Sequence, residues 1–285
     1  MIPELIADYQ CGCGEGPMWH PLEKRVYWVD IPTGRLFRYD PATGHHEMCF
    51  QGDQIGGFTI QEDGALLLFM NHGAIRLWRG GELQTLVEEI AEEKETRFND
   101  VIADPEGRVF CGTMPTKERL GRLYRLDRDG SLRIVLEEVG CSNGMGFTPD
   151  RKAMYYTDSR VQRIYRFDYN RATGELSNQT LFVQTPEDEG VPDGMTVDAE
   201  GYVWTAKWDG SCLVRYAPNG TEERRVTFPA KQVSSVVFGG EQYQDTYVTT
   251  AGGTKKETNG PGAGALFRVS MGIRGVPEFY SRIAV

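Results

Sequence analysis

Histidine and long apolar runs are scarce in this 285-residue sequence. It contains only four histidines: His20, His45, His46 and His72. They form no metal-binding or catalytic pattern, so we expect them at the surface. No histidine follows His72, so the match to a serine-hydrolase pattern at residues 140–144 lacks its downstream partner. No window approaches the ~18 consecutive apolar residues that a membrane-spanning helix requires.

An excess of positive charge is also missing. The 31 Lys and Arg residues are outnumbered by 41 Asp and Glu residues, which gives a formal net charge of -10. Without a basic stripe we expect no nucleic-acid partner, since nothing would displace counterions from phosphates. The N-terminus lacks a basic region followed by an apolar run, so no signal peptide is expected. The six cysteines show no disulfide framework. We therefore expect a soluble, cytoplasmic protein without a membrane partner; its oligomeric state stays open.

The sequence is rich instead in turns, with 34 glycines and 14 prolines. A turn followed by a short strand recurs every 41 to 50 residues, as in Ala103–Gly107 and Val197–Gly201. Short runs of alternating aromatic and β-branched residues, such as Arg35–Asp40 and Arg163–Asp168, fill each interval. No convincing amphipathic helix is present. This pattern predicts an all-β repeat protein.

The length and content of the repeat predict a six-bladed β-propeller with four strands per blade. A stacked β-solenoid is the weaker rival, because its coils are usually shorter than the ~40 residues seen here. We expect residues 1–285 to form one domain. Residues 3–8 precede the first repeat, so we expect an N-terminal strand that closes the last blade.

One column of the repeat is rich in polar side chains. Its six members are Glu15, Gly56, Asn99, Asn143, Asp193 and Ser234. In a propeller, equivalent positions on the innermost strands surround the central axis at one height, so these oxygens should converge. Oxygen ligands suit hard divalent cations. Any one Asn or Asp more often satisfies backbone groups at a strand end, but four at one repeat offset favour a site.

At this point the motifs resemble those of the SMP-30/gluconolactonase/regucalcin family. They are Cys11–Pro17, Arg97–Asp100, Cys111–Met114, Ser142–Gly144 and Pro192–Met195, in family order over nearly the whole chain. The resemblance implies a lactonase acting on sugar lactones, with one divalent cation (Ca²⁺, Zn²⁺, Mn²⁺ or Mg²⁺). It implies metal ligation by Glu15, Asn143 and Asp193, with Asp193 also the general base. It implies substrate contacts from Arg97 and Asn99.

The sequence departs from the family at Lys117, where members with a sugar-contacting acid after Gly-Thr-Met have an acidic residue. Lys117 and the adjacent Glu118 are the candidate contacts in this loop. Strand alternation turns Asp100 away from Asn99, which predicts a structural hydrogen bond for its carboxylate. The glycine-rich segment 252–264 is expected to form a long, mobile loop.

These inferences predict a metal-dependent lactonase that opens a sugar lactone to the aldonic acid. Two other classes stay open. One is a phosphotriesterase-like or arylesterase-like hydrolase on the same propeller, and the other is a calcium-binding regulatory propeller without turnover. The specific lactone and the resident metal are not readable from the sequence.

Overall fold

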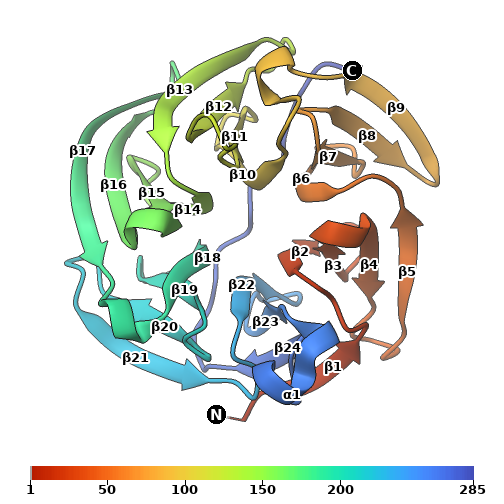
Figure 1. Ribbon diagram of the computed structural model, residues 1–285, viewed down its shortest axis with the longest axis vertical. Coiled ribbons are helices and arrows are strands. Elements are labelled where there is room, and N and C mark those ends of the chain that lie inside the picture. Colours follow the sequence, from red (N-terminus) through yellow and green to blue (C-terminus); the bar gives the residue numbers. More distant parts are fainter. Residues whose placement is uncertain (1) are drawn as a thin grey trace.

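The computed structural model describes residues 2–285. These residues form six four-stranded antiparallel sheets arranged as blades around a central axis (Figure 1). The predicted six-bladed propeller is therefore confirmed. In each blade the strands are hydrogen-bonded in the order in which they follow one another in the chain, starting from the innermost strand, and only β1 (Glu4–Asp8) departs from this order. Short turns suffice to join such antiparallel neighbours.

Blades 1 to 3 follow one another in the chain. Blade 1 contains β2 (Gly14–His20), β3 (Arg25–Asp30), β4 (Arg35–Tyr39) and β5 (His46–Gln51). Blade 2 contains β6 (Ile55–Ile60), β7 (Leu66–Met70), β8 (Ile75–Arg79) and β9 (Glu82–Val87). Blade 3 contains β10 (Phe98–Ala103), β11 (Val109–Thr113), β12 (Gly121–Leu126) and β13 (Leu132–Val139).

Blades 4 to 6 complete the ring. Blade 4 contains β14 (Ser142–Phe147), β15 (Ala153–Asp158), β16 (Arg163–Asn170) and β17 (Glu175–Gln184). Blade 5 contains β18 (Val191–Val197), β19 (Val203–Trp208), β20 (Cys212–Tyr216) and β21 (Glu222–Thr227). Blade 6 contains β22 (Val233–Gly239), β23 (Asp245–Thr250), β24 (Ala265–Ser270) and, outermost, β1 (Glu4–Asp8). The N-terminal strand thus closes the last blade, as predicted.

Helical structure in residues 2–285 is limited to single turns. The 3₁₀ turns are η1 (Ile31–Thr33), η2 (Ala91–Glu93), η3 (Ser159–Val161), η4 (Glu187–Glu189) and η5 (Gly253–Lys255), and the α-helical turn is α1 (Lys256–Asn259). Within this range no helix is both long enough and apolar enough to cross a bilayer.

Segment 252–264 is more ordered than expected for a mobile loop. It contains η5 and α1, and its start is bonded to the N-terminal segment. The Gly252 amide donates to the Gly12 carbonyl at 3.0 Å, and the Gly253 amide donates to the Cys11 carbonyl at 2.9 Å. The sequence did not reveal this pairing because it joins residues about 240 positions apart.

The recurring turn has a clear physical basis. In blade 3, Asp104 Oδ1 accepts from the amides of Glu106 and Arg108, and in blade 5 Asp198 Oδ1 accepts from the amides two and four residues on. Gly107 and Gly201 close these turns with φ of 89° and 83°, a conformation that other residues rarely adopt. In blades 3 and 5 the recurring turn is therefore an aspartate turn.

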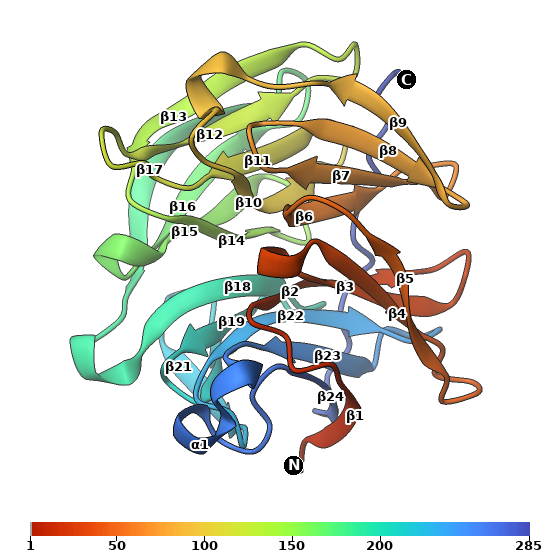
Figure 2. The ribbon, with the colours of Figure 1, turned by 45° about the vertical axis from the view of Figure 1, so that its right-hand side comes forward.

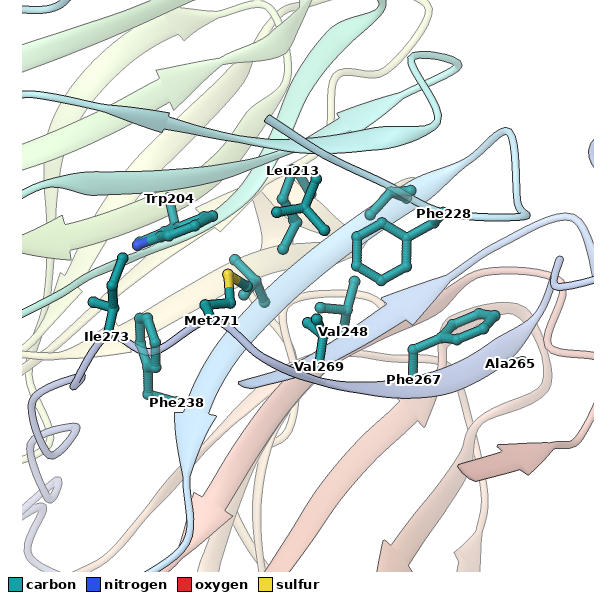
Figure 3. Packing of buried hydrophobic residues seen from close by; sticks show 14 residues of the cluster. Trp204, Leu213, Phe228, Phe238, Val248, Ala265, Phe267, Val269, Met271 and Ile273 are labelled. Atoms are coloured by element: carbon teal, nitrogen blue, oxygen red, sulfur yellow. The ribbon is translucent and has the colours of Figure 1, made fainter. Parts of the chain in front are cut away.

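The core lies between blades. Figure 3 shows Trp204 and Leu213 of blade 5 packed with Phe238, Val248 and Phe267 of blade 6. Burial of each such side chain stabilises the fold by about 1.5–3 kcal/mol. Apolar packing thus holds the blades to one another, and hydrogen bonds hold the strands together within each blade.

His20 is buried, at 1% exposure, with its Nε2 2.9 Å from the Gly64 carbonyl oxygen. The expected surface location was therefore wrong for this histidine.

The C-terminal segment 271–285 crosses the face at the carboxyl ends of the inner strands (Figure 2). The Ala199 amide donates to the Arg274 carbonyl at 2.9 Å, in blade 5. Farther along, the Ser281 amide donates to the Ile60 carbonyl of blade 2 at 2.9 Å, and the Arg282 amide donates to the Gly107 carbonyl of blade 3 at 2.8 Å. The tail therefore ties three blades together across this end of the channel.

One lysine is fully buried in blade 5. The Lys207 ammonium donates to Thr185 Oγ1 at 2.6 Å and lies 5.5 Å from the centre of the Tyr216 ring. Burial lowers the pKa of Lys207 from its ordinary 10.5 to about 8. The unfolded chain therefore binds more protons between these two values, so folding stability rises with pH through this window.

We expect Lys207→Met to be more stable than the wild type near pH 7, by about 3 kcal/mol. The advantage should shrink as pH rises from 8 to 10.5, because the wild-type lysine is then neutral in the folded state. Urea unfolding across this pH range measures the difference. Lys152→Met, at an exposed position, is the control. A difference that does not change with pH would contradict the prediction.

Candidate active site

Each inner strand is irregular at the polar column. The pairing register with the next strand shifts there in all six blades: Glu15/Met18, Ile55/Gly57, Phe98/Val101, Ser142/Met145, Pro192/Met195 and Val233/Ser235. Bulges of this kind re-aim side chains and are common beside active sites. The column therefore marks the points at which the inner strands leave regular pairing near the axis.

Four column residues line one cavity of about 280 Å³: Glu15, Asn99, Asn143 and Asp193. Arg97, which directly precedes β10, lines it too. The four column side chains are 4–7% exposed. The structure thus gathers, from blades 1, 3, 4 and 5, five of the seven residues that the sequence assigned to a site.

The other two column positions contribute no oxygen to this cavity. A Cβ on Gly56 would lie 2.0 Å from the Phe98 carbonyl oxygen, so this position has room only for glycine. Ser234 Oγ donates to the Gly14 carbonyl at 2.5 Å and lies 3.0 Å from Thr249 Oγ1. The expectation that its oxygen points at the common centre was therefore wrong.

The two carboxylates of the cavity are held in an unfavourable environment. Burial, and then the neighbouring Asp193, raise the pKa of Glu15 well above its usual range. Burial, and then Asp100, raise the pKa of Asp193, which Arg97 partly opposes. Two buried like charges without a compensating cation destabilise the charged state. Positive charge beyond that of Arg97 would therefore stabilise the charged forms of Glu15 and Asp193.

A one-way series of hydrogen bonds links the polar groups. Arg97 donates to Asn99 Oδ1 at 2.6 Å. Asn99 Nδ2 donates to Asn143 Oδ1 at 2.9 Å and to the Ser142 carbonyl at 2.7 Å. Asn143 Nδ2 donates to Ser159 Oγ at 2.8 Å, and Ser159 donates to the Pro192 carbonyl at 2.6 Å. The series joins blades 3, 4 and 5.

Asp100 lies outside this cavity, as strand alternation predicts. It lines a second, smaller cavity of about 60 Å³, with Glu278 of the C-terminal tail among its walls. Burial raises the pKa of Asp100 to about 7, and Arg97 opposes the shift. The hydrogen bond expected for its carboxylate is not formed within residues 2–285. The Asp100 charge also raises the pKa values of Asp193 and Glu15.

Lys117 and Glu118 do not line the central cavity. Both are exposed and border a separate surface hollow together with Arg122 and Arg160. The hollow adjoins the site along the chain, because Met114 and Ser159 line the cavity and the residues that follow them line the hollow. Their contact with a substrate stays a prediction.

Six further residues line the cavity, none of which the sequence assigned to catalysis, metal binding or substrate contact: Cys13, Met114, Cys141, Ser159, Val191 and Trp208. Cys141 Sγ lies 3.6 Å from Met114 Sδ, so one wall is formed by sulfur. Burial raises the pKa of the Cys141 thiol to about 12, which keeps it neutral. Cys13 occupies the same strand face as Glu15, the one signal that could have identified it.

The donor set fits a hard divalent cation only if amide oxygen takes part. No group of three or more His, Cys, Asp or Glu side chains in residues 2–285 is placed to hold a metal ion. Glu15 and Asp193 supply carboxylates from blades 1 and 5, and Asn143 supplies a neutral oxygen from blade 4. Carboxylate and amide oxygens are ordinary ligands of Ca²⁺ and similar ions. The fit therefore depends on how the Asn143 amide is oriented.

The sequence profile of the SMP-30/Gluconolactonase/LRE-like region matches residues 13–252. The chain belongs to this family. The resemblance inferred from the motifs is thereby confirmed.

The chain is similar to a pentonolactonase and to regucalcins. The chain is 48% identical to pentonolactonase XacC of Haloferax volcanii over 290 residues, which covers 99% of each sequence. It is 30% identical to human regucalcin, with 97% of each sequence covered. The structure of a calcium-binding regucalcin from Agrobacterium tumefaciens superimposes with a TM-score of 0.92 at 24% identity, covering 99% of this chain and 98% of that one. At that identity the superposition shows the shared fold.

We expect Glu15→Gln to stabilise the protein in the presence of a chelator at pH 8, by at least about 3 °C in Tm. A carboxyl whose folded pKa exceeds its unfolded pKa contributes full stability below the unfolded value and loses it as pH rises. The gap between variant and wild type should therefore close towards pH 4.5. Glu82→Gln, at an exposed position of β9, is the matched control. A variant less stable than the wild type at pH 8 would refute this account of the cavity.

Proposed function

We propose that this protein is a lactonase that hydrolyses a sugar lactone to the aldonic acid with the help of one divalent cation. The convergence of Glu15, Asn143 and Asp193 on one cavity beside Arg97 and Asn99 carries the proposal. Membership of a family with pentonolactonase XacC among its members supports the substrate class.

In this proposal, Glu15, Asn143 and Asp193 hold the cation. When bound, a divalent cation polarises the lactone carbonyl and lowers the pKa of a bound water. The cation would also stabilise the charged forms of both carboxyls, which burial and then neighbouring acids disfavour. The residues present fit that group by charge and by donor type.

Arg97 and Asn99 orient the sugar, and Asp193 moves the proton of the attacking water. The Arg97 guanidinium and the Asn99 amide suit the hydroxyl and carbonyl oxygens of an aldonolactone. Asp193 takes the proton from the attacking water as the general base. The acyl C–O bond then breaks, and the ring oxygen leaves as a hydroxyl with the proton that Asp193 took from the water. The cavity, at about 280 Å³, is close to the lower bound of about 300 Å³ for small-molecule pockets, which favours a compact monosaccharide lactone.

A calcium-binding propeller without turnover is the second candidate. The regucalcin relatives favour it, since the solved one is described as a calcium-binding protein. All six cysteines are free, in keeping with a reducing compartment, so we place either activity in the cytoplasm.

A panel of aldonolactones, assayed by acid release with Ca²⁺, Mn²⁺, Mg²⁺ and Zn²⁺ in turn, tests the proposal. We expect turnover of at least one lactone that a chelator abolishes and a cation restores. Metal binding without lactone turnover would favour the regulatory candidate. Turnover of an organophosphate or aryl ester in preference to every lactone would favour the other hydrolase classes.

We expect Asp193→Ala to lower kcat by about 10³-fold or more and to weaken metal binding, because one carboxylate serves as ligand and base. Steady-state kinetics and calorimetric metal titration measure the two effects. Asp209→Ala removes an exposed acid near the cavity-lining Trp208 and is the control. Full activity of Asp193→Ala with metal bound would remove Asp193 from the mechanism.

We expect Arg97→Ala to raise KM by about tenfold while the metal Kd changes less, since a guanidinium cannot ligate a cation. Asn99 keeps its orientation in this variant because Nδ2 still donates to the Ser142 carbonyl. Kinetics and metal titration of the same sample separate the effects. Loss of metal binding in this variant would contradict the assignment of Arg97 to the substrate.

A further inference from the structure

The Ser159 hydroxyl accepts a hydrogen bond from the side-chain amide of Asn143. Ser159 begins η3 directly after β15, is 6% exposed, and lines the cavity. Its Oγ lies 2.6 Å from the Pro192 carbonyl oxygen and 2.8 Å from Asn143 Nδ2. Sequence reasoning assigned no role to this residue, because it lies outside the repeated column.

The chemistry of these contacts permits one orientation. A carbonyl oxygen only accepts, so the Ser159 hydroxyl must donate its single proton to Pro192. The hydroxyl can then only accept from Asn143, which must present its NH₂ group. Asn143 Oδ1 is therefore turned the other way, towards Asn99.

The opposite end of the series imposes the same direction independently. Asn99 Nδ2 donates to the Ser142 carbonyl, which also only accepts. Asn99 thus presents its NH₂ group on that side, and the facing atom of Asn143 must be its oxygen. A flipped Asn143 would place two NH₂ groups against each other, and an NH₂ group is not a metal ligand.

We propose that Ser159 is a positioning residue that fixes the Asn143 amide with its oxygen available to the cation. The inference rests on the proposed function, since it concerns the same cation. Ser159 also donates to the carbonyl of Pro192, the residue before Asp193. One hydroxyl therefore links the proposed ligand Asn143 of blade 4 to the segment of blade 5 that carries Asp193. Outer groups that orient ligands in this way typically contribute ~10- to 100-fold to metal affinity.

Ser159→Ala leaves the buried Nδ2 of Asn143 with only the weakly accepting Cys141 sulfur, at 3.8 Å. We expect the Kd for Ca²⁺ or Mn²⁺, measured by titration calorimetry, to rise by at least about tenfold. Ser281→Ala is the matched control. Ser281 is fully buried, accepts from Thr59 Oγ1 at 2.8 Å and donates to the Ile60 carbonyl at 3.2 Å, remote from the cavity. This control should lose thermal stability but keep the wild-type Kd.

A double-mutant cycle separates orientation from packing. Aspartate presents oxygen in either orientation, so Asn143→Asp removes the need for an anchored amide. In the Asn143→Asp background the Ser159 hydroxyl, which donates to Pro192, faces a carboxylate oxygen that cannot donate to it, so we expect Ser159→Ala to cause no loss of metal affinity there. A Ser159 that acts only through packing would cost the same in both backgrounds.

Wild-type affinity in Ser159→Ala, or an equal loss in both backgrounds, would overturn the role of Ser159 and leave the proposed function standing. A wild-type protein that binds none of the divalent cations would overturn both. The wild-type titration and the variant titrations therefore report on the two proposals separately.

Discussion

The pairing of β1 with β24 closes the ring on which the site depends. Glu4 lies opposite Arg268 and Asp8 opposite Ala265, so the first strand of the chain completes the last blade. The chain then passes within a few residues into β2, which carries Glu15 at the axis. A cavity-lining residue from the first blade can meet cavity-lining residues from blades 4 and 5 only because the ends of the chain are joined. The C-terminal tail adds further bonds across the opposite face, so both termini hold the ring closed.

A closed ring of apolar blades makes the axis a costly place for charge. Two carboxylates, two amides and an arginine occupy a buried cavity there, at a position where every inner strand leaves its regular pairing. The raised pKa values of Glu15 and Asp193 express that cost. Natural proteins retain such destabilising groups where binding or catalysis uses them. In the proposed function, a bound divalent cation would offset this cost, and stability and ligand affinity would then be coupled through these two side chains.

Orientation is the second property that the ring supplies. Arg97, Asn99, Asn143 and Ser159 each have their hydrogen-bonding direction set by a backbone carbonyl or by the next side chain. The two carbonyls at the ends, from Ser142 and Pro192, belong to inner strands of adjacent blades. The blades therefore fix the direction of the amides as well as their position. This matters for a cation, because only the oxygen of an asparagine can bind it.

The sequence by itself determined the repeat, the six blades, the closing N-terminal strand and the residues that meet at the axis. It could do so because strand alternation and aspartate turns are local, and because equal spacing in a closed ring places equivalent residues at equal height. Only the tertiary structure decided which oxygens face the cavity. Ser234 has the right spacing but bonds to the Gly14 carbonyl of the next blade, and Ser159 has no repeat signal but faces the cavity. The burial of His20 and the pairing of segment 252–264 with the N-terminal residues were likewise decided by neighbours distant in the chain. Side-chain direction depends on contacts between blades, and those contacts leave no period in the sequence.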